Sequence, residues 1–164
     1  MSYGFFGKVL WVDLTNDNFR EEEVPEKIYR QFMGGYGLGC RLLYERMLSH
    51  INPLSPESII GFFPGLLTST AAPYSGRYMV VGKSPLTGTW GDANSGGTFG
   101  PALKACGYDG ILFIGKSKKP MYISIIDNTI KILDASDIWG KDVIETEKTL
   151  KNRHGNSIKT AGIG

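Results

Sequence analysis

The stretch DGILFIGKSKKPMYISIIDNTIKILD, residues 109–134, decides the fold class. Three short runs rich in isoleucine and other apolar residues, at 111–114, 121–127 and 130–133, are separated by charged and turn-forming residues. Runs of this length and composition predict β-strands, and the Asp127-Asn128 pair between the last two predicts a tight turn. We therefore expect a meander of antiparallel strands here.

The flanking sequence adds more strands and a few helices, without regular strand–helix alternation. Strands are expected at 8–14 and 18–24, as an N-terminal hairpin, and at 58–63 and 78–83. Helices are expected from Pro25 to 33, over 38–47, from Pro101 to a stop at Gly107, and over 143–153 behind an Asp142 cap. The pattern predicts one α+β domain over 1–164 with mostly antiparallel β-sheets. The stretch 158–164 begins like a strand and then stops, so we expect a C-terminally truncated fragment of a longer chain.

Length, charge and cysteine content exclude several classes of protein. A chain of 164 residues can bury a core without disulfides or structural metals. The net charge is +2 with Lys and Arg spread along the chain, so no nucleic-acid partner is expected. No stretch approaches the roughly 20 apolar residues of a membrane span, which favours a cytoplasmic protein without membrane contact. Cys40 and Cys106 are far apart in the sequence and have no second Cys or His at metal-ligand spacing, so we expect two buried thiols and no zinc or iron–sulfur site in this chain.

Most side chains that could hold an anion lie between the strand ending near residue 63 and the helix at Pro101. They are Arg77, Lys83, Ser84, Thr87, Asp92, Asn94 and Ser95, together with the glycines of segment 91–100. A glycine-rich loop that leads into a helix exposes backbone N–H groups to phosphate, and arginine adds a planar pair of donors. The alternative is that the glycines only form turns and that Arg77 pairs with a surface carboxylate. Residue types alone therefore predict an anion-binding loop.

A second glycine-rich run, GGYGLG at 34–39, has some of the letters of a dinucleotide-binding fingerprint. It follows a predicted helix instead of a strand, which is the wrong context for dinucleotide binding. We interpret it as a tight connection between two helices.

A series of short motifs runs through nearly the whole chain in a fixed order. They are GKVL (7–10), VDLT (12–15), PLSPE (53–57), GRY (76–78), KSPLTG (83–88), ANSGG (93–97), GYD (107–109), DAS (134–136) and WGK (139–141). Each motif alone is weak, but their joint order and spacing are specific. Together they resemble the N-terminal domain of the tungsten-containing aldehyde ferredoxin oxidoreductase family.

The resemblance implies a cofactor, a set of contacts and a reaction. Its members hold tungsten, or by extension molybdenum, through two pterin-dithiolene molecules, and their N-terminal sheets lie against this cofactor. Carried over by motif, Arg77, Asn94 and Gly96 contact the pterin or its phosphate, with Ser95 between them, and the Asn94 main-chain carbonyl binds a Mg²⁺ ion between the pterin phosphates. Oxygen ligands suit Mg²⁺.

The resemblance also implies partners that lie outside these residues. Family members oxidise small aldehydes to carboxylic acids and pass electrons through an iron–sulfur cluster, held by later domains of the full-length protein, to ferredoxin. The first partner of this segment would thus be the remainder of its own chain, and homo-oligomers are compatible with the sequence. The segment by itself is expected to be inactive.

Two alternatives remain open from the sequence. A relative on the same scaffold could reduce another substrate, such as an aromatic acyl-CoA thioester. A chain with two isolated cysteines could also be a stand-alone binding or assembly module without redox activity.

Overall fold

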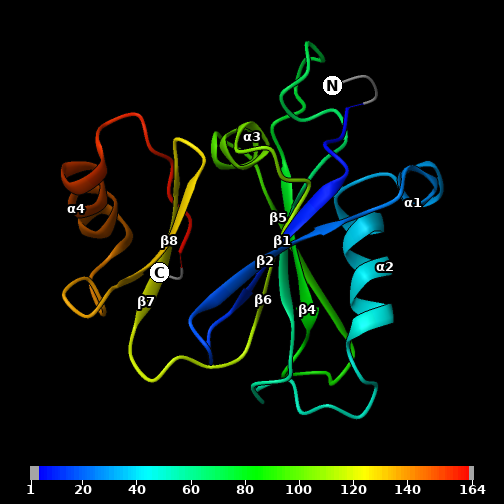
Figure 1. Cartoon of the computed structure of the whole chain (residues 1–164), viewed down its shortest axis with the longest axis horizontal. Helices are drawn as coiled ribbons and strands as arrows, with labels where there is room; N and C mark the ends of the chain where they lie inside the picture. Colours follow the sequence, from blue (N-terminus) through cyan, green and yellow to red (C-terminus); the bar gives the residue numbers. More distant parts are fainter. Residues whose placement is uncertain (1–3, 163–164) are drawn as a thin grey trace. The chain divides into compact units, whose positions relative to one another are not determined.

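A computed structural model describes residues 4–162 of the chain. The chain divides into two compact units, residues 1–116 and 117–164, which are described separately below (Figure 1). Within residues 4–162, no helix is long and apolar enough to cross a membrane.

The first unit is built on a six-stranded sheet. Its strands are β1 (Lys8–Asp13), β2 (Asn18–Glu23), β3 (Ile60–Pro64), β4 (Tyr78–Lys83), β5 (Trp90–Ser95) and β6 (Ile111–Ile114). They are ordered β2-β1-β6-β3-β4-β5, so β5 forms one edge of the sheet. The central pair β1–β6 is parallel, and every other pair is antiparallel.

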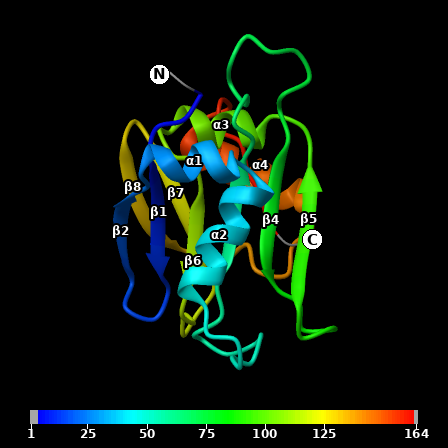
Figure 2. The ribbon, with the colours of Figure 1, turned by 90° about the vertical axis from the view of Figure 1, so that its right-hand side faces the viewer.

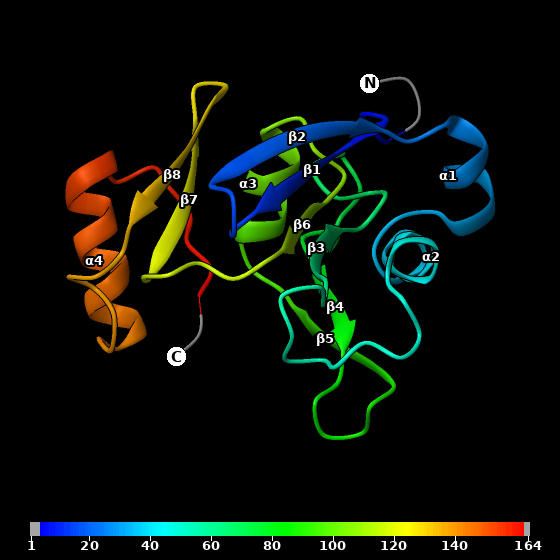
Figure 3. The ribbon, with the colours of Figure 1, turned by 60° about the horizontal axis from the view of Figure 1, so that its bottom comes forward.

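Two helices, α1 (Glu26–Phe32) and α2 (Tyr36–Arg46), cover one face of this sheet (Figure 2). A third helix, α3 (Phe99–Ala105), lies on the opposite face (Figure 3). The main core joins alternate sheet residues to one side of α2; its fully buried members include Val9, Phe63, Val81, Leu112, Leu38 and Leu43. A Cβ on Gly39 would lie 2.8 Å from Val81 and 2.9 Å from Phe63, so glycine at this position lets α2 approach the sheet closely. Each buried large side chain contributes roughly 1.5–3 kcal/mol to stability.

The position of α3 is fixed by a buried ion pair. Lys104 Nζ lies 2.5 Å from Asp109 Oδ1, and both side chains are 2% exposed. The second oxygen of Asp109 accepts a hydrogen bond from Tyr29 Oη at 2.8 Å and from the backbone N–H of Phe6 and Gly7. This carboxylate therefore joins α3, α1 and the segment that leads into β1.

The second unit consists of the hairpin β7 (Met121–Ile126) and β8 (Thr129–Asp134), followed by α4 (Val143–His154). Asp127 and Asn128 both have positive φ, at 49° and 59°, as a two-residue hairpin turn requires. Asp142 Oδ1 accepts a hydrogen bond from Glu145 N at 2.8 Å and so caps α4. A small core of Ala135, Ile138 and Leu150 forms within this unit.

The α+β class with mostly antiparallel sheets is confirmed, but the expected meander is wrong. β6 pairs with β1 and β3 in the large sheet, whereas β7 and β8 form a separate two-stranded sheet. The sequence patterns of the three strands look alike, because side-chain alternation reports burial and not which strand lies alongside.

Other local expectations also need correction. The first half of the predicted loop 91–100 is the strand β5, and α3 begins at Phe99, two residues before Pro101. Helix α2 begins at Tyr36, so only the first part of the run 34–39 connects helices. Residues 158–162 form no strand, and the rest of that predicted strand lies outside the described residues. Cys40 is exposed, because it lies on the solvent side of α2, and Cys106 is partly buried.

Candidate functional site

Arg77 and Asn94, predicted as parts of one site, lie in direct contact. Arg77 immediately precedes β4, and Asn94 is the penultimate residue of β5, which pairs with β4 in antiparallel register. Arg77 Nε donates to Asn94 Oδ1 at 2.9 Å, and Nη2 donates to the same oxygen. Both side chains are exposed, so the remaining guanidinium N–H groups face a surface that a ligand can reach.

Tyr36 is a third member of this cluster that the sequence did not indicate. Asn94 Nδ2 donates to Tyr36 Oη at 3.0 Å, across a sequence separation of 58 residues. Tyr36 is the first residue of α2, so the cluster combines a helix start with the ends of two neighbouring strands. Its only local signal was a hydroxyl-bearing side chain within the glycine-rich run 34–39.

Glycines allow the backbone segments around Arg77 to lie close together. A Cβ on Gly100 would lie 2.9 Å from the carbonyl oxygen of Gly76, a distance that no side chain tolerates. Gly97 has φ of +87°, in the left-handed region that favours glycine. A Cβ on Gly96 would lie 3.8 Å from Arg77 Nη1, so Gly96 leaves the guanidinium uncovered on that side. Glycines here bring the segment 96–100 against the start of β4.

A buried threonine hydrogen-bonds to the backbone next to Arg77. Thr68 is fully buried, and its hydroxyl donates to the carbonyl oxygen of Ser75 at 2.7 Å, with the Arg77 carbonyl 3.3 Å away. Gly65 N donates to the same Arg77 carbonyl. No signal in the sequence indicated Thr68, because its hydrogen-bond partners are backbone atoms, which every residue type has.

The register of β5 determines what Asn94 and Ser95 present to solvent. Ser84 N donates to Thr89 O just beyond the strand ends, and antiparallel pairs alternate between hydrogen-bonded and non-hydrogen-bonded. Ser84 and Thr89 form a hydrogen-bonded pair, and Met79 and Asn94 lie five pairs further along the hairpin. Met79 and Asn94 are therefore a non-hydrogen-bonded pair. The Asn94 carbonyl therefore points away from β4, toward the free edge of the sheet. The Ser95 side chain lies on the opposite face from that of Asn94, because side chains alternate along a strand.

The other predicted anion-binding residues do not join this cluster. Lys83 Nζ donates to the carbonyl oxygens of Ser49 and Ile51, both at 2.7 Å. Ser84 and Thr87 lie in the turn between β4 and β5, at the far end of the hairpin from Arg77. Asp92 lies on β5 two residues before Asn94 and shares its face. The single loop expected from the sequence is thus two separate ends of a hairpin, and the helix that adjoins Asn94 is α2 instead of α3.

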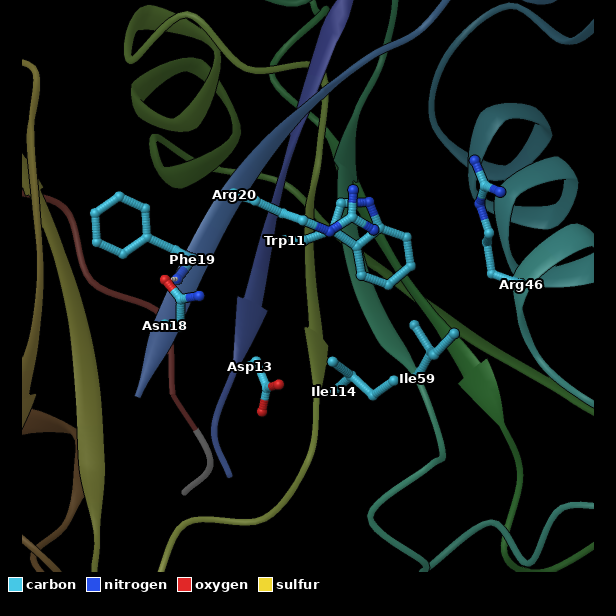
Figure 4. A pocket seen from close by; sticks show the side chains of 8 residues that line it. All are labelled: Trp11, Asp13, Asn18, Phe19, Arg20, Arg46, Ile59 and Ile114. Atoms are coloured by element: carbon cyan, nitrogen blue, oxygen red, sulfur yellow. Dashed lines mark hydrogen bonds between the residues drawn. The ribbon is translucent and has the colours of Figure 1, made fainter. Parts of the chain in front are cut away.

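A hollow of about 290 Å³ lies elsewhere on the α2 face of the sheet (Figure 4). Its lining includes Trp11, Arg20 and Arg46, at the β1–β2 side and the C-terminal end of α2. The Arg20 guanidinium stacks over the Trp11 ring at 5.2 Å, and both arginines form ion pairs with Glu22. Because its cationic groups already have carboxylate partners, this hollow is a weaker candidate for an anion than the Arg77 cluster.

Comparison with known proteins gave three concordant matches. The family described as "Aldehyde ferredoxin oxidoreductase, N-terminal domain" matches residues 9–164. A tungsten-containing aldehyde ferredoxin oxidoreductase of Pyrococcus furiosus is 47% identical over 163 residues, which cover 99% of this chain and 27% of that protein. The WOR-like subunit of an aliphatic sulfonate oxidoreductase from the same organism is 37% identical over 90% of this chain and 24% of its own length. The chain thus spans about a quarter of the length of the curated relatives it matches.

A solved structure agrees with the backbone described above. The active-site complex BamBC of benzoyl coenzyme A reductase, bound to 1,5-dienoyl-CoA, superimposes with a TM-score of 0.92. It is 34% identical to this chain and covers 94% of it, while the match takes up 24% of the solved chain.

Proposed function

The chain belongs to the aldehyde ferredoxin oxidoreductase family, and from that premise we propose that it holds one side of a tungsten bis-pterin cofactor. The parent enzyme would oxidise aldehydes to carboxylic acids with ferredoxin as electron acceptor. Tungsten is named in the relatives, which supports this metal over molybdenum.

The observation that carries the proposal is the contact between Arg77 and Asn94. The two residues come from different motifs, 17 positions apart, and hydrogen-bond at an exposed end of the β4–β5 hairpin. Two of the five guanidinium N–H donors are used by Asn94, and within residues 4–162 no other partner is found for the rest, which remain for a ligand. A planar cation beside glycines that leave it uncovered suits a phosphate or the carbonyl groups of a pterin ring. The residues present therefore fit the cofactor.

The free edge of β5 supports a role for the Asn94 carbonyl in Mg²⁺ binding. Carbonyl oxygens are good Mg²⁺ ligands, and this one is directed away from its neighbouring strand. The Asn94 carbonyl would hold this Mg²⁺ ion, and the Arg77 guanidinium would hold a phosphate. One carbonyl supplies only part of an octahedral shell, so phosphate and water would supply the rest.

The bound tungsten bis-pterin supplies the redox chemistry, in which an aldehyde and water give a carboxylic acid, two electrons and two protons. The part of this chain is to bind and orient the cofactor: Arg77 and Asn94 hold its anionic edge, and Thr68 fixes the backbone that carries Arg77. We assign the iron–sulfur cluster, the substrate pocket and the contact with ferredoxin to the remainder of the full-length protein. A cytoplasmic location and assembly into homo-oligomers belong to the same proposal.

A second reaction is favoured by one comparison. The BamBC complex, which belongs to benzoyl coenzyme A reductase, shares this backbone at 34% identity. A parent enzyme with the same cofactor-binding residues could therefore reduce an aromatic acyl-CoA. Assays of the full-length protein with aldehydes plus an oxidised viologen dye, and with an aromatic acyl-CoA plus a strong reductant, distinguish the two reactions.

The proposal is tested by cofactor content. Full-length protein purified without oxygen is expected to contain tungsten by plasma mass spectrometry and pterin by fluorescence of its oxidised product. Arg77→Ala and Asn94→Ala are expected to lower both by several-fold, since the first removes the donors to an anionic group and the second removes the side chain that holds the guanidinium in place. The matched control is Arg30→Ala, an exposed arginine of α1 that pairs with Glu26.

Two outcomes would contradict the proposed function or the proposed site. Wild-type protein without tungsten, molybdenum or pterin would refute the function and favour a stand-alone binding module. Full occupancy in both variants would refute the site while leaving the family assignment intact.

A further inference from the structure

The Asn94 side-chain amide has a defined orientation in the cluster. Arginine can only donate hydrogen bonds, so the Asn94 atom that faces Arg77 must be the carbonyl oxygen. The amide nitrogen then faces Tyr36 Oη, at 3.0 Å. The tyrosine oxygen is consequently the acceptor of this bond.

This orientation leaves the Tyr36 hydroxyl proton available to a ligand. A phenol both accepts and donates, and Asn94 uses its accepting side. Among the described residues, the only hydrogen bond found for Tyr36 Oη is the one from Asn94. Its O–H can therefore rotate to donate outward, toward the surface that Arg77 also faces.

The hydrogen-bonded series Arg77–Asn94–Tyr36 makes the Tyr36 hydroxyl a stronger hydrogen-bond donor. The guanidinium withdraws electron density from the Asn94 oxygen, which makes the amide N–H a stronger donor to Tyr36. Polarisation of the phenol oxygen makes its own O–H a stronger donor in turn. Helix α2 has no acidic residue in its first turn, so no carboxylate on that turn competes with an anionic ligand for this proton.

We propose that Tyr36 is a further binding residue for the cofactor, donating its hydroxyl proton to a phosphate oxygen of the pterin. The inference rests on the proposed function and adds a third segment, the start of α2, to the two strand ends named above. The phosphate is then held by donors from two segments, the start of β4 and the start of α2, with Asn94 of β5 joining them, which fixes its position more narrowly than a single arginine could.

The test is the rate at which full-length protein loses its cofactor. Tyr36→Phe removes only the hydroxyl, and we expect release of tungsten and pterin, followed by anaerobic gel filtration, to become about tenfold faster, the loss of one charge-assisted hydrogen bond. The matched control is Tyr44→Phe, which removes the hydroxyl of a residue on the same helix that is 84% exposed. Circular dichroism and the thermal midpoint of both variants should equal those of the wild type.

A double variant separates direct contact from positioning. If Tyr36 contacts the phosphate, Tyr36→Phe speeds release further in an Asn94→Ala background; if it only orients Asn94, the effect disappears there and the proposal is overturned. Release from Tyr36→Phe at the control rate overturns it as well. Arg77→Ala tests the proposed cofactor site as a whole. If Arg77→Ala loses cofactor while Tyr36→Phe releases it at the wild-type rate, the role of Tyr36 is refuted and the proposed function is not.

Discussion

A single carboxylate, Asp109, accepts from donors in three other parts of the first unit. Its two oxygens accept from Lys104, from the Tyr29 hydroxyl and from two backbone N–H groups, and the side chain is almost wholly buried. Burying a charge is costly unless every lone pair finds a donor, and here the donors come from α1, α3 and the segment before β1. Burial and the nearby carboxylate raise the pKa of the Tyr29 phenol far above its ordinary value, so Tyr29 remains a neutral donor.

Replacing this carboxylate should destabilise the fold strongly. Asp109→Ala leaves the Lys104 ammonium buried without its carboxylate partner, and we expect a loss of about 3–5 kcal/mol in the free energy of unfolding. Urea unfolding followed by circular dichroism measures this loss. The control is Glu147→Ala, which removes an exposed ion pair with Lys151 and should change stability little. Similar midpoints for the two variants would contradict the role given to Asp109.

At the scale of elements, strand β2 is joined to the segment after α3 by Glu21. Its carboxylate accepts from the Tyr108 hydroxyl at 2.6 Å and from Lys8 Nζ at 3.0 Å. The bond from Tyr108, and then that from Lys8, hold the pKa of Glu21 below its ordinary 4.5. A carboxyl with a lowered pKa stabilises the fold above its unfolded-state pKa, and this stabilisation is lost as the pH falls through the folded-state value.

The pH dependence of a Tyr108→Phe variant tests this link. The variant lacks the main cause of the lowered pKa, so it should unfold at lower urea concentration than the wild type at pH 7. Once the pH falls below the lowered pKa of Glu21 in the wild type, this carboxyl is protonated in both proteins and the difference should shrink. Tyr44→Phe is the control and should show no such trend. A deficit of equal size at both pH values would show that Tyr108 acts through packing instead.

Most elements could be predicted from the sequence, because hydrophobic alternation and turn residues are local signals. The hairpin of β1 and β2, strand β4 and the capped helix α4 follow from such signals. Strand β5 could not be found this way, since Gly91, Asp92 and Asn94 are poor strand formers and only pairing with β4 makes them extended. Arg77 and Asn94 were found through their motifs, whereas the Tyr36 contact depends on a fold that brings together residues 58 positions apart.

At the scale of the whole molecule, the division into two units has an experimental signature. Lys116 and Lys118 are exposed and lie outside helices and strands, at the boundary between the units. Limited digestion with trypsin should therefore cut first after one of these lysines, because exposed irregular segments are preferred sites. Mass spectrometry of the fragments identifies the cut. In a Lys116→Gln, Lys118→Gln variant the same fragments should form much later; unchanged early fragments would contradict this boundary.

The parallel pairing of β1 with β6 determines when the sheet can form during synthesis. Leu10 lies opposite Ile111, so about 100 residues must be made before β1 meets its partner on that side. At about 5–20 residues per second, the ribosome needs roughly 5–20 s for that interval. Throughout it the hairpin of β1 and β2 carries Val9, Leu10, Trp11 and Val12, which are buried in the finished protein. The nascent chain thus exposes an apolar strand for several seconds, and we expect this hairpin to be a site of chaperone binding during synthesis.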